Sequence, residues 1–74
     1  MKIKIVIAGG TGFVGQGIIK QLSPETFEVH SLSRHHYEPT ETDHTIYHAV
    51  DLSQLQEWKH IVEDADWVID AVGI

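Results

Sequence analysis

The feature that most constrains this chain is a glycine-rich turn between an apolar stretch and a helical pattern. Glycines recur every three residues at Gly9, Gly12 and Gly15, directly after the apolar stretch at residues 2–8. A helical repeat of apolar side chains over residues 13–22 follows at once. The first N–H groups of a helix have no backbone partner and carry about half a positive charge, so an anion fits there. This context predicts a phosphate cradle rather than a chance cluster of glycines.

Composition and charge limit the class of protein. The chain has 74 residues, enough for one small domain, and no cysteine, so neither a disulfide nor a thiolate metal site can stabilise it. The net charge is −6 and the five Lys and Arg residues are scattered, which argues against binding to nucleic acid or a membrane surface. The first apolar stretch is too short for a signal peptide, and no segment approaches the ~18 apolar residues of a membrane span. We therefore expect a soluble, cytoplasmic protein.

The spacing of apolar residues predicts alternating strands and helices. Strands are expected at residues 2–8, 27–33, 45–50 and 67–72, and helices at residues 13–22 and from a Ser53 cap to about Val62. A helix between two strands implies parallel pairing and a right-handed crossover. The strands then lie in the order three, two, one, four, with one helix on each face. This α/β arrangement is half of a doubly wound parallel sheet, the Rossmann fold.

The fourth predicted strand would form an unprotected edge of this sheet. Val68, Ile69, Ala71 and Val72 make it apolar on both faces, whereas edge strands are normally blunted. We therefore expect a fifth strand beside it, so that residues 1–74 are the N-terminal part of a longer domain. The alternative is a complete small domain that associates with itself through this strand. Asp70 is unusual within such a strand, because a buried carboxylate requires a polar partner; it marks either an exposed face or a polar contact to residues outside this chain.

Each glycine of the turn has a physical role in this interpretation. Gly9 permits the tight exit from the strand, and Gly12 lets the backbone approach a pyrophosphate. Gly15 lets the helix pack close to the first strand. The alternative is a turn whose glycines serve only close packing.

The run Gly-Gly-Thr-Gly-Phe-Val-Gly at residues 9–15 resembles the nucleotide loop of short-chain dehydrogenase/reductase proteins. It is most similar to the extended and atypical branches, which include sugar-nucleotide epimerases, dehydratases and NmrA-like proteins. The resemblance covers essentially the whole chain, but only the N-terminal third of such a protein. It implies an NAD(P) cofactor whose pyrophosphate is held by the backbone of Phe13 and Val14, with Thr11 tying down the turn.

The end of the second predicted strand is expected to contact the adenosine ribose and so to distinguish NAD from NADP. NAD sites carry an Asp or Glu there, whereas an Arg accommodates the 2′-phosphate of NADP. Here Ser33 can donate one hydrogen bond, and Arg34 can form a charge-assisted pair with a phosphate. We therefore predict NADP rather than NAD. The alternative is that Arg34 only solvates the strand end and Glu38 binds the NAD ribose; the nearby acids Glu41 and Asp43 also oppose an extra phosphate.

Two further segments complete the predicted cofactor site. Asp51 and Leu52 follow the third predicted strand, and in the proteins that this chain resembles such a pair contacts the adenine. The alternative is that Asp51 only shapes the turn before the second helix. Ala71, Val72 and Gly73 lie at the carboxyl end of the fourth predicted strand, where ligands bind in open sheets.

The sequence predicts no catalytic residue and no metal ligand within this chain. Enzymes of the resembled family use a Tyr-x-x-x-Lys pair, but neither Tyr37 nor Tyr47 has a lysine four residues later. His44 and His48 would share a strand face yet lie ~13 Å apart, too far for one metal ion. Two hypotheses remain: the whole protein is an oxidoreductase or a sugar-nucleotide epimerase or dehydratase, or it is a non-catalytic NADP-binding regulatory or accessory protein.

Overall fold

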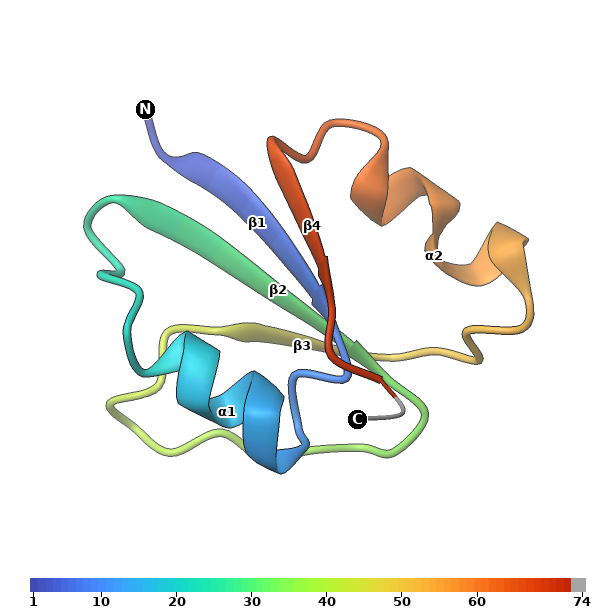
Figure 1. The fold of residues 1–74 in the computed structure, drawn as a ribbon, viewed down its shortest axis with the longest axis horizontal. Helices are drawn as coiled ribbons and strands as arrows, with labels where there is room; N and C mark the ends of the chain where they lie inside the picture. The colour runs from blue at the N-terminus through green and yellow to red at the C-terminus, as the bar shows by residue number, and fades with distance from the viewer. Residues whose placement is uncertain (73–74) are drawn as a thin grey trace.

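The computed structural model describes residues 1–72, which form four strands and two helices. In chain order they are β1 (Ile3–Ala8), α1 (Phe13–Ile19), β2 (Phe27–Ser33), β3 (Ile46–Ala49), α2 (Leu55–Val62) and β4 (Trp67–Asp70). Their types and their order are those predicted from the sequence (Figure 1).

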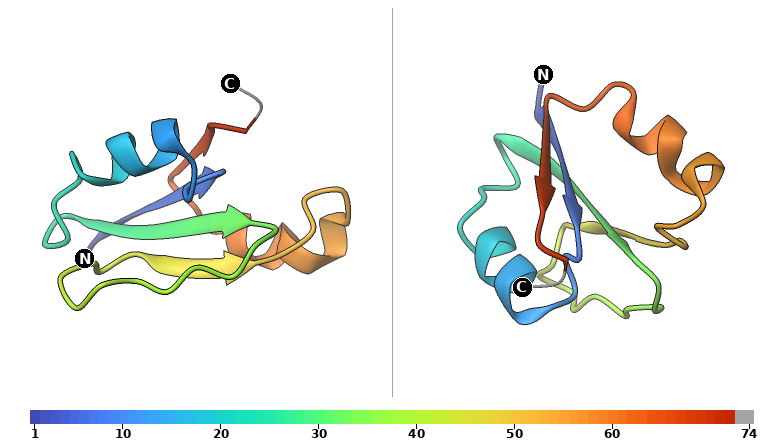
Figure 2. Two further views of the ribbon diagram at one scale, coloured as in Figure 1. Left: turned by 90° about the horizontal axis from the view of Figure 1, so that it is seen from below. Right: turned by 45° about the vertical axis from the view of Figure 1, so that its right-hand side comes forward.

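The strands form a four-stranded parallel sheet in the order β3-β2-β1-β4, which confirms the predicted half of a doubly wound fold. In its register Ile5 of β1 lies between Val29 of β2 and Trp67 of β4. Helix α1 covers one face of the sheet and α2 covers the other (Figure 2). Because the strands are parallel, their carboxyl ends lie at one end of the sheet.

Two apolar cores lie on the two faces of the sheet. On the α1 face, Ile5, Ile7 and Val29 are buried against α1, and on the α2 face Val6 and Leu32 are buried with Ile61 of α2. The solvent exposure of Val6 and of Ile7 is 0%, so β1 is buried on both faces. Burial on both faces is expected of a central strand in a parallel sheet.

Three predicted elements end earlier in the structure than the sequence pattern indicates, β3 by one residue and α1 and β4 by more. Helix α1 ends at Ile19, and the Leu22 N–H then donates to the Ile19 carbonyl at 3.1 Å, which closes a tighter turn. Strand β4 ends at Asp70 because the Asp70 carboxylate accepts a hydrogen bond from the Val72 N–H at 3.0 Å, which turns the chain out of the sheet. Asp70 is exposed to solvent, so its carboxylate is not buried in the sheet and needs no further partner there.

The predicted Ser53 cap of the second helix is wrong. Helix α2 begins at Leu55 behind Gln54, whose side chain makes no capping hydrogen bond. The Ser53 N–H and hydroxyl both donate to Asp51 Oδ1, at 3.0 and 2.7 Å. An aspartate two residues earlier therefore takes up the groups that a cap would have used.

Strand β4 forms one edge of the sheet and exposes apolar side chains. Trp67 is 64% exposed and Val68 is 58% exposed. The fifth strand expected beside them remains a prediction.

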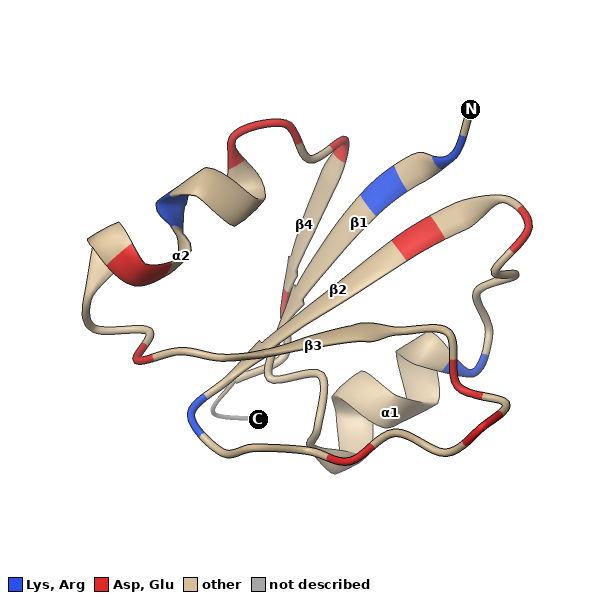
Figure 3. Cartoon of the chain, turned by 180° about the vertical axis from the view of Figure 1, so that it is seen from behind, with Lys and Arg blue, Asp and Glu red and all other residues tan. Residues whose placement is uncertain are grey.

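Charged residues are distributed unevenly over the fold. Acidic residues gather in the loop between β2 and β3 and in the turn between α2 and β4, whereas the Lys and Arg residues, except Lys2 and Lys4 at the start of β1, lie apart from one another (Figure 3). None of the helices within residues 1–72 combines the length and the apolar character that a membrane crossing requires.

Candidate functional site

A cavity of about 640 Å³ opens where the strands end at the carboxyl edge of the sheet. It is bounded by the glycine turn, the end of β2, the segment between β3 and α2, and the residues after β4. Its lining residues are Gly9, Thr11, Gly12, Phe13, Val14, Leu32, Ser33, Arg34, Asp51, Leu52, Ser53, Ala71 and Val72. Four segments far apart in the sequence thus meet at one concave surface, the usual place for a ligand in an open α/β sheet.

The structure brings together nearly all the residues that the sequence singled out. Of the predicted cofactor-binding residues, Gly15 lies behind the turn rather than in the lining, and Gly73 lies outside the described residues. Leu32 and Ser53 line the cavity although the sequence analysis did not select them. Leu32 precedes the predicted Ser33-Arg34 pair and Ser53 follows Asp51-Leu52, so proximity in sequence was the available signal.

The glycine turn leaves β1 through a backbone conformation that side chains disfavour. Gly9 has φ of +84°, in the left-handed region where glycine carries no steric penalty. Its N–H donates to the Leu32 carbonyl at 2.7 Å, and its carbonyl accepts from the Gly12 N–H at 3.1 Å. The turn is therefore fastened to the end of β2 before the chain enters α1.

Gly12 and Gly15 meet different surroundings. A Cβ atom on Gly15 would overlap the Gly9 carbonyl oxygen and the Gly10 Cα, so close packing of α1 on the turn requires glycine there. A Cβ on Gly12 would lie 3.5 Å from the Gly9 oxygen, which is ordinary contact. Gly12 borders the cavity and precedes α1, whose first N–H groups have no partner within the helix.

The side chains of Gln16, Ser31 and Tyr47 support the turn, although the sequence did not point to them. The Gln16 side-chain amide donates to the Gly10 carbonyl at 2.8 Å and to the Tyr47 hydroxyl at 3.2 Å, which joins the turn to β3. A Cβ on Gly10 would overlap the buried Ser31 hydroxyl beneath it, and that hydroxyl has no hydrogen-bond partner among residues 1–72. These contacts link side chains on separate elements, so sequence spacing gives no signal for them.

Besides the Gln16 amide, a carboxylate in the β2–β3 loop also binds Tyr47. Its hydroxyl donates to Asp43 Oδ2 at 2.6 Å. Burial, together with the hydrogen bond to Asp43, raises the pKa of Tyr47 to about 12. Burial by itself would raise the pKa of Asp43, but the hydrogen bonds from Tyr47 and from the Thr45 N–H together outweigh it and hold that pKa below its ordinary value.

We expect Tyr47 to ionise late in an alkaline titration. The folded state favours the neutral phenol, so its contribution to stability is complete below pH ~10 and is lost as the pH rises through about 12. Absorbance of the tyrosinate ion measures this directly, and the late transition should vanish in Tyr47→Phe. A wild-type titration in which both tyrosines ionise by pH ~10.5 would contradict this expectation.

Arg34 lies over the end of β2 beside the cavity. Its side chain is 74% exposed, and its Nη2 lies 3.6 Å from Asp51 Oδ1. The Ser33 hydroxyl donates to the His35 carbonyl at 3.0 Å, so it supports the loop that carries Arg34. Exposure leaves the guanidinium free to exchange Asp51 for another anion, since an exposed pair of this kind contributes little to stability.

Asp51 lies beside Arg34 and has a fixed orientation. Hydrogen bonds from Ser53, and then the nearby Arg34 charge, hold the pKa of Asp51 below its ordinary value, so it is ionised at neutral pH. The next residue, Leu52, offers its carbonyl to the Trp58 indole N–H at 3.1 Å, which anchors this wall to α2. Asp51 therefore shapes the turn and also lines the cavity.

The described residues contain no set of three His, Cys, Asp or Glu side chains placed to hold a metal ion. The chemistry available in the cavity is that of backbone N–H groups, one guanidinium, one carboxylate, the hydroxyls of Thr11, Ser33 and Ser53, and apolar walls. Such a lining suits an elongated ligand with an anionic centre and flat apolar ends.

Comparison with protein families matches residues 5–74 to the NAD dependent epimerase/dehydratase family. Comparisons with curated proteins and with solved structures give no match. The family match confirms the epimerase/dehydratase part of the predicted resemblance, and it confirms the expected cofactor at the level of a nicotinamide dinucleotide. Because the match spans almost the entire chain and the sheet has the predicted order, this chain belongs to the NAD dependent epimerase/dehydratase family.

Proposed function

We propose that this chain binds NADP in the cavity at the carboxyl edge of the sheet. In this proposal the pyrophosphate lies over Gly12 at the start of α1, and the adenosine lies against Arg34 and Asp51. The observation that carries the proposal is the convergence of the glycine turn and the ends of β2, β3 and β4 on a single cavity. A volume of about 640 Å³ lies within the range of small-molecule sites.

The adenosine end has chemistry suited to each part of that group. The ionised Asp51 carboxylate can accept a hydrogen bond from the exocyclic amine of adenine, and Leu52 offers an apolar surface to the ring. Asp51 is already oriented by Ser53, so little ordering is lost when adenine binds. The nicotinamide end would then extend toward Ala71 and Val72.

The preference for NADP rests on Arg34. A 2′-phosphate carries more negative charge than one carboxylate, and it can accept two hydrogen bonds from the guanidinium at once. Of the three acids that could oppose this phosphate, two have other partners: Glu38 contacts His36 at 2.6 Å, and Asp43 accepts from Tyr47. These contacts favour NADP over the alternative in which Glu38 binds the ribose of NAD.

The family supports a role for the whole protein as an oxidoreductase or a sugar-nucleotide epimerase or dehydratase. A bound nicotinamide would supply hydride transfer, and this chain's own residues would bind and orient it. Within this chain the residues serve binding, and we assign no catalytic residue among them.

Titration of the protein with NADPH and NADH tests the proposal. We expect Arg34→Ala to weaken NADPH binding about tenfold or more, because a charge-assisted pair with phosphate is lost, and to change NADH binding by less than about twofold. Calorimetry or the fluorescence of the reduced nicotinamide gives both affinities.

Lys59→Ala is the matched control, since it removes one positive charge from the exposed face of α2. It should leave both affinities unchanged. Equal binding of NADPH and NADH that does not respond to Arg34→Ala would overturn the preference for NADP. Failure of the wild-type protein to bind either nucleotide would overturn the proposed function.

A further inference from the structure

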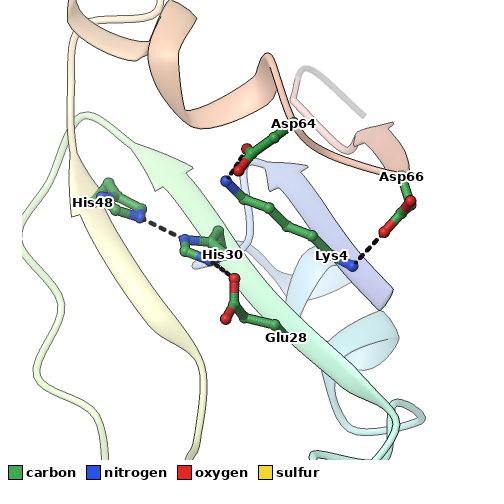
Figure 4. Close-up of polar contacts among 6 residues, drawn as sticks. All are labelled: Lys4, Glu28, His30, His48, Asp64 and Asp66. Atoms are coloured by element: carbon green, nitrogen blue, oxygen red, sulfur yellow. Dashed lines mark hydrogen bonds and ion pairs between the residues drawn. The ribbon is translucent and has the colours of Figure 1, made fainter. Parts of the chain in front are cut away.

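Three polar side chains form a hydrogen-bonded chain across β2 and β3 on the α2 face of the sheet. His30 Nδ1 lies 2.9 Å from His48 Nε2, and His30 Nε2 lies 2.9 Å from Glu28 Oε2 (Figure 4). The two imidazole planes differ by 11° and their centroids are 5.2 Å apart. With the nitrogens only 2.9 Å apart, these values describe rings joined in line through their nitrogens rather than stacked face to face. We call Glu28, His30 and His48 the histidine clasp.

The number of protons in the histidine clasp follows from its geometry. An ionised carboxylate only accepts hydrogen bonds, so His30 Nε2 must carry a hydrogen toward Glu28. The contact between His30 Nδ1 and His48 Nε2 needs one hydrogen between the two nitrogens. Both conditions hold when the pair is neutral, and also when His30 alone is protonated. They fail when both rings are protonated, because two imidazolium groups then present hydrogens to each other.

Other charged groups near the clasp are already paired or carry the same sign. Lys4 of β1 binds Asp64 through its ammonium group at 2.5 Å and Asp66 through its backbone N–H at 2.8 Å. His60 of α2, when charged, repels a proton on His48. Burial, followed by the charges of His30, His60 and Lys4, lowers the pKa of His48. Glu28 is thus the carboxylate in contact with the pair.

The histidine clasp fastens an edge strand that leads into the candidate site. Strand β3 has four residues and pairs with β2, with His48 opposite Leu32. Leaving β3, the Val50 N–H donates to the Ser33 carbonyl at 2.7 Å, and Asp51 then enters the cavity wall. Loss of the His30–His48 contact therefore acts on a short strand next to that wall.

We propose that the histidine clasp is a proton-controlled fastening of β3: it holds β3 on β2 with up to one added proton, and the second proton releases β3. Release of β3 loosens the Asp51-Leu52-Ser53 wall and weakens nucleotide binding. That last step rests on the proposed function, whereas the release of β3 does not. Because the folded state favours neutral His48, its stabilising effect is complete above the ordinary histidine pKa of ~6.5 and is lost as the pH falls.

Proton NMR titration of the wild-type protein from pH ~7.5 to ~4.5 tests the coupling of the two rings. We expect the first added proton to shift the signals of His30 and His48 together, and the second to be taken up at a lower pH. Amide hydrogen exchange, expressed as protection factors, should show protection in β3 falling about tenfold or more over the second step. Independent single-site titration of the two histidines, or undiminished protection of β3 at pH ~4.5, would overturn the proposal.

His48→Gln separates the clasp from general acid sensitivity. A glutamine amide can still donate to His30 Nδ1 but does not take up a proton in this range, so protection in β3 should become nearly independent of pH. His44→Gln, which removes an exposed histidine from the preceding loop, should behave as the wild type does. If protection in β3 of His48→Gln falls at acid pH as much as it does in the wild type, the proposal is overturned. If that variant does not fold, the wild-type titration and exchange data decide alone.

Nucleotide binding at the two ends of this pH range tests the last step. We expect the affinity for NADPH to fall about tenfold together with the protection of β3. Absence of NADPH binding at neutral pH would refute the proposed function and leave the release of β3 to be judged from exchange. Unchanged NADPH affinity in a protein whose β3 has opened would refute the coupling between strand and cavity.

Discussion

Gly15→Ala is expected to lower the free energy of unfolding by about 3 kcal/mol or more, a large part of the stability of so small a domain. The added methyl group would overlap the Gly9 carbonyl oxygen and the Gly10 Cα. Both are backbone atoms of a turn fastened to β2, so neither can move aside as a flexible side chain could. The glycine turn, α1 and the end of β2 would have to separate, and the cavity would be lost with them. Denaturant unfolding followed by circular dichroism measures the change.

Gly17→Ala provides the matched control two residues further along α1. A Cβ on Gly17 meets nothing within 4 Å, so the same substitution should raise the free energy of unfolding by about 0.5–1 kcal/mol through helix propensity. Changes of opposite sign in the free energy of unfolding at Gly15 and Gly17 would distinguish the effect of close packing from that of backbone entropy. A Gly15→Ala protein as stable as the wild type would show that α1 does not pack against the turn as described.

The order of the strands could be predicted because it follows from chain connectivity. Each helix between strands demands a parallel crossover of fixed hand, and the first strand is apolar on both faces, which puts it inside the sheet. Those rules leave few arrangements, and the structure has the predicted one. Most residues of the candidate site could be predicted for the same reason, since parallel strands bring their carboxyl ends to one edge.

Local competition between polar groups was harder to predict. The spacing of Ser53 and Gln56 is typical of a capping box, but Asp51 binds both the N–H and the hydroxyl of Ser53. The helix begins instead at Leu55, whose side chain is 53% exposed. A pattern rule evaluates one motif at a time, whereas the folded chain satisfies all nearby donors together.

Contacts across the sheet could not be predicted without its register. The expected shared strand face of His44 and His48 is wrong, because His44 lies in the loop before β3, and the partner of His48 is His30 on the neighbouring strand. The contact depends on the pairing of Leu32 with His48, which sequence spacing does not reveal. The same applies to Gln16, which reaches Tyr47 on β3.

Gly12→Ala is expected to leave the fold nearly intact and to weaken NADPH binding about thirtyfold, or about 2 kcal/mol. Gly12 has φ of −79° and ψ of 175°, a conformation open to any residue, and its new Cβ would make only ordinary contact with the Gly9 oxygen. Stability should therefore fall by less than about 1 kcal/mol, the difference between glycine and alanine at a helix cap. Under the proposed function the methyl group occupies the space over which the pyrophosphate must approach the backbone. Parallel measurements of unfolding and of NADPH and ADP affinity give both quantities.

The contrast between Gly12 and Gly15 makes this test specific for the ligand. A turn whose glycines serve only packing would tolerate alanine at Gly12 without any change in nucleotide affinity, because the unliganded structure has room there. A turn that cradles phosphate would lose affinity for NADPH and for ADP alike, since both carry the pyrophosphate. Loss confined to NADPH would instead locate the disturbance near the nicotinamide or the 2′-phosphate. If Gly12→Ala binds NADPH and ADP as tightly as the wild type does, the pyrophosphate does not lie at the start of α1.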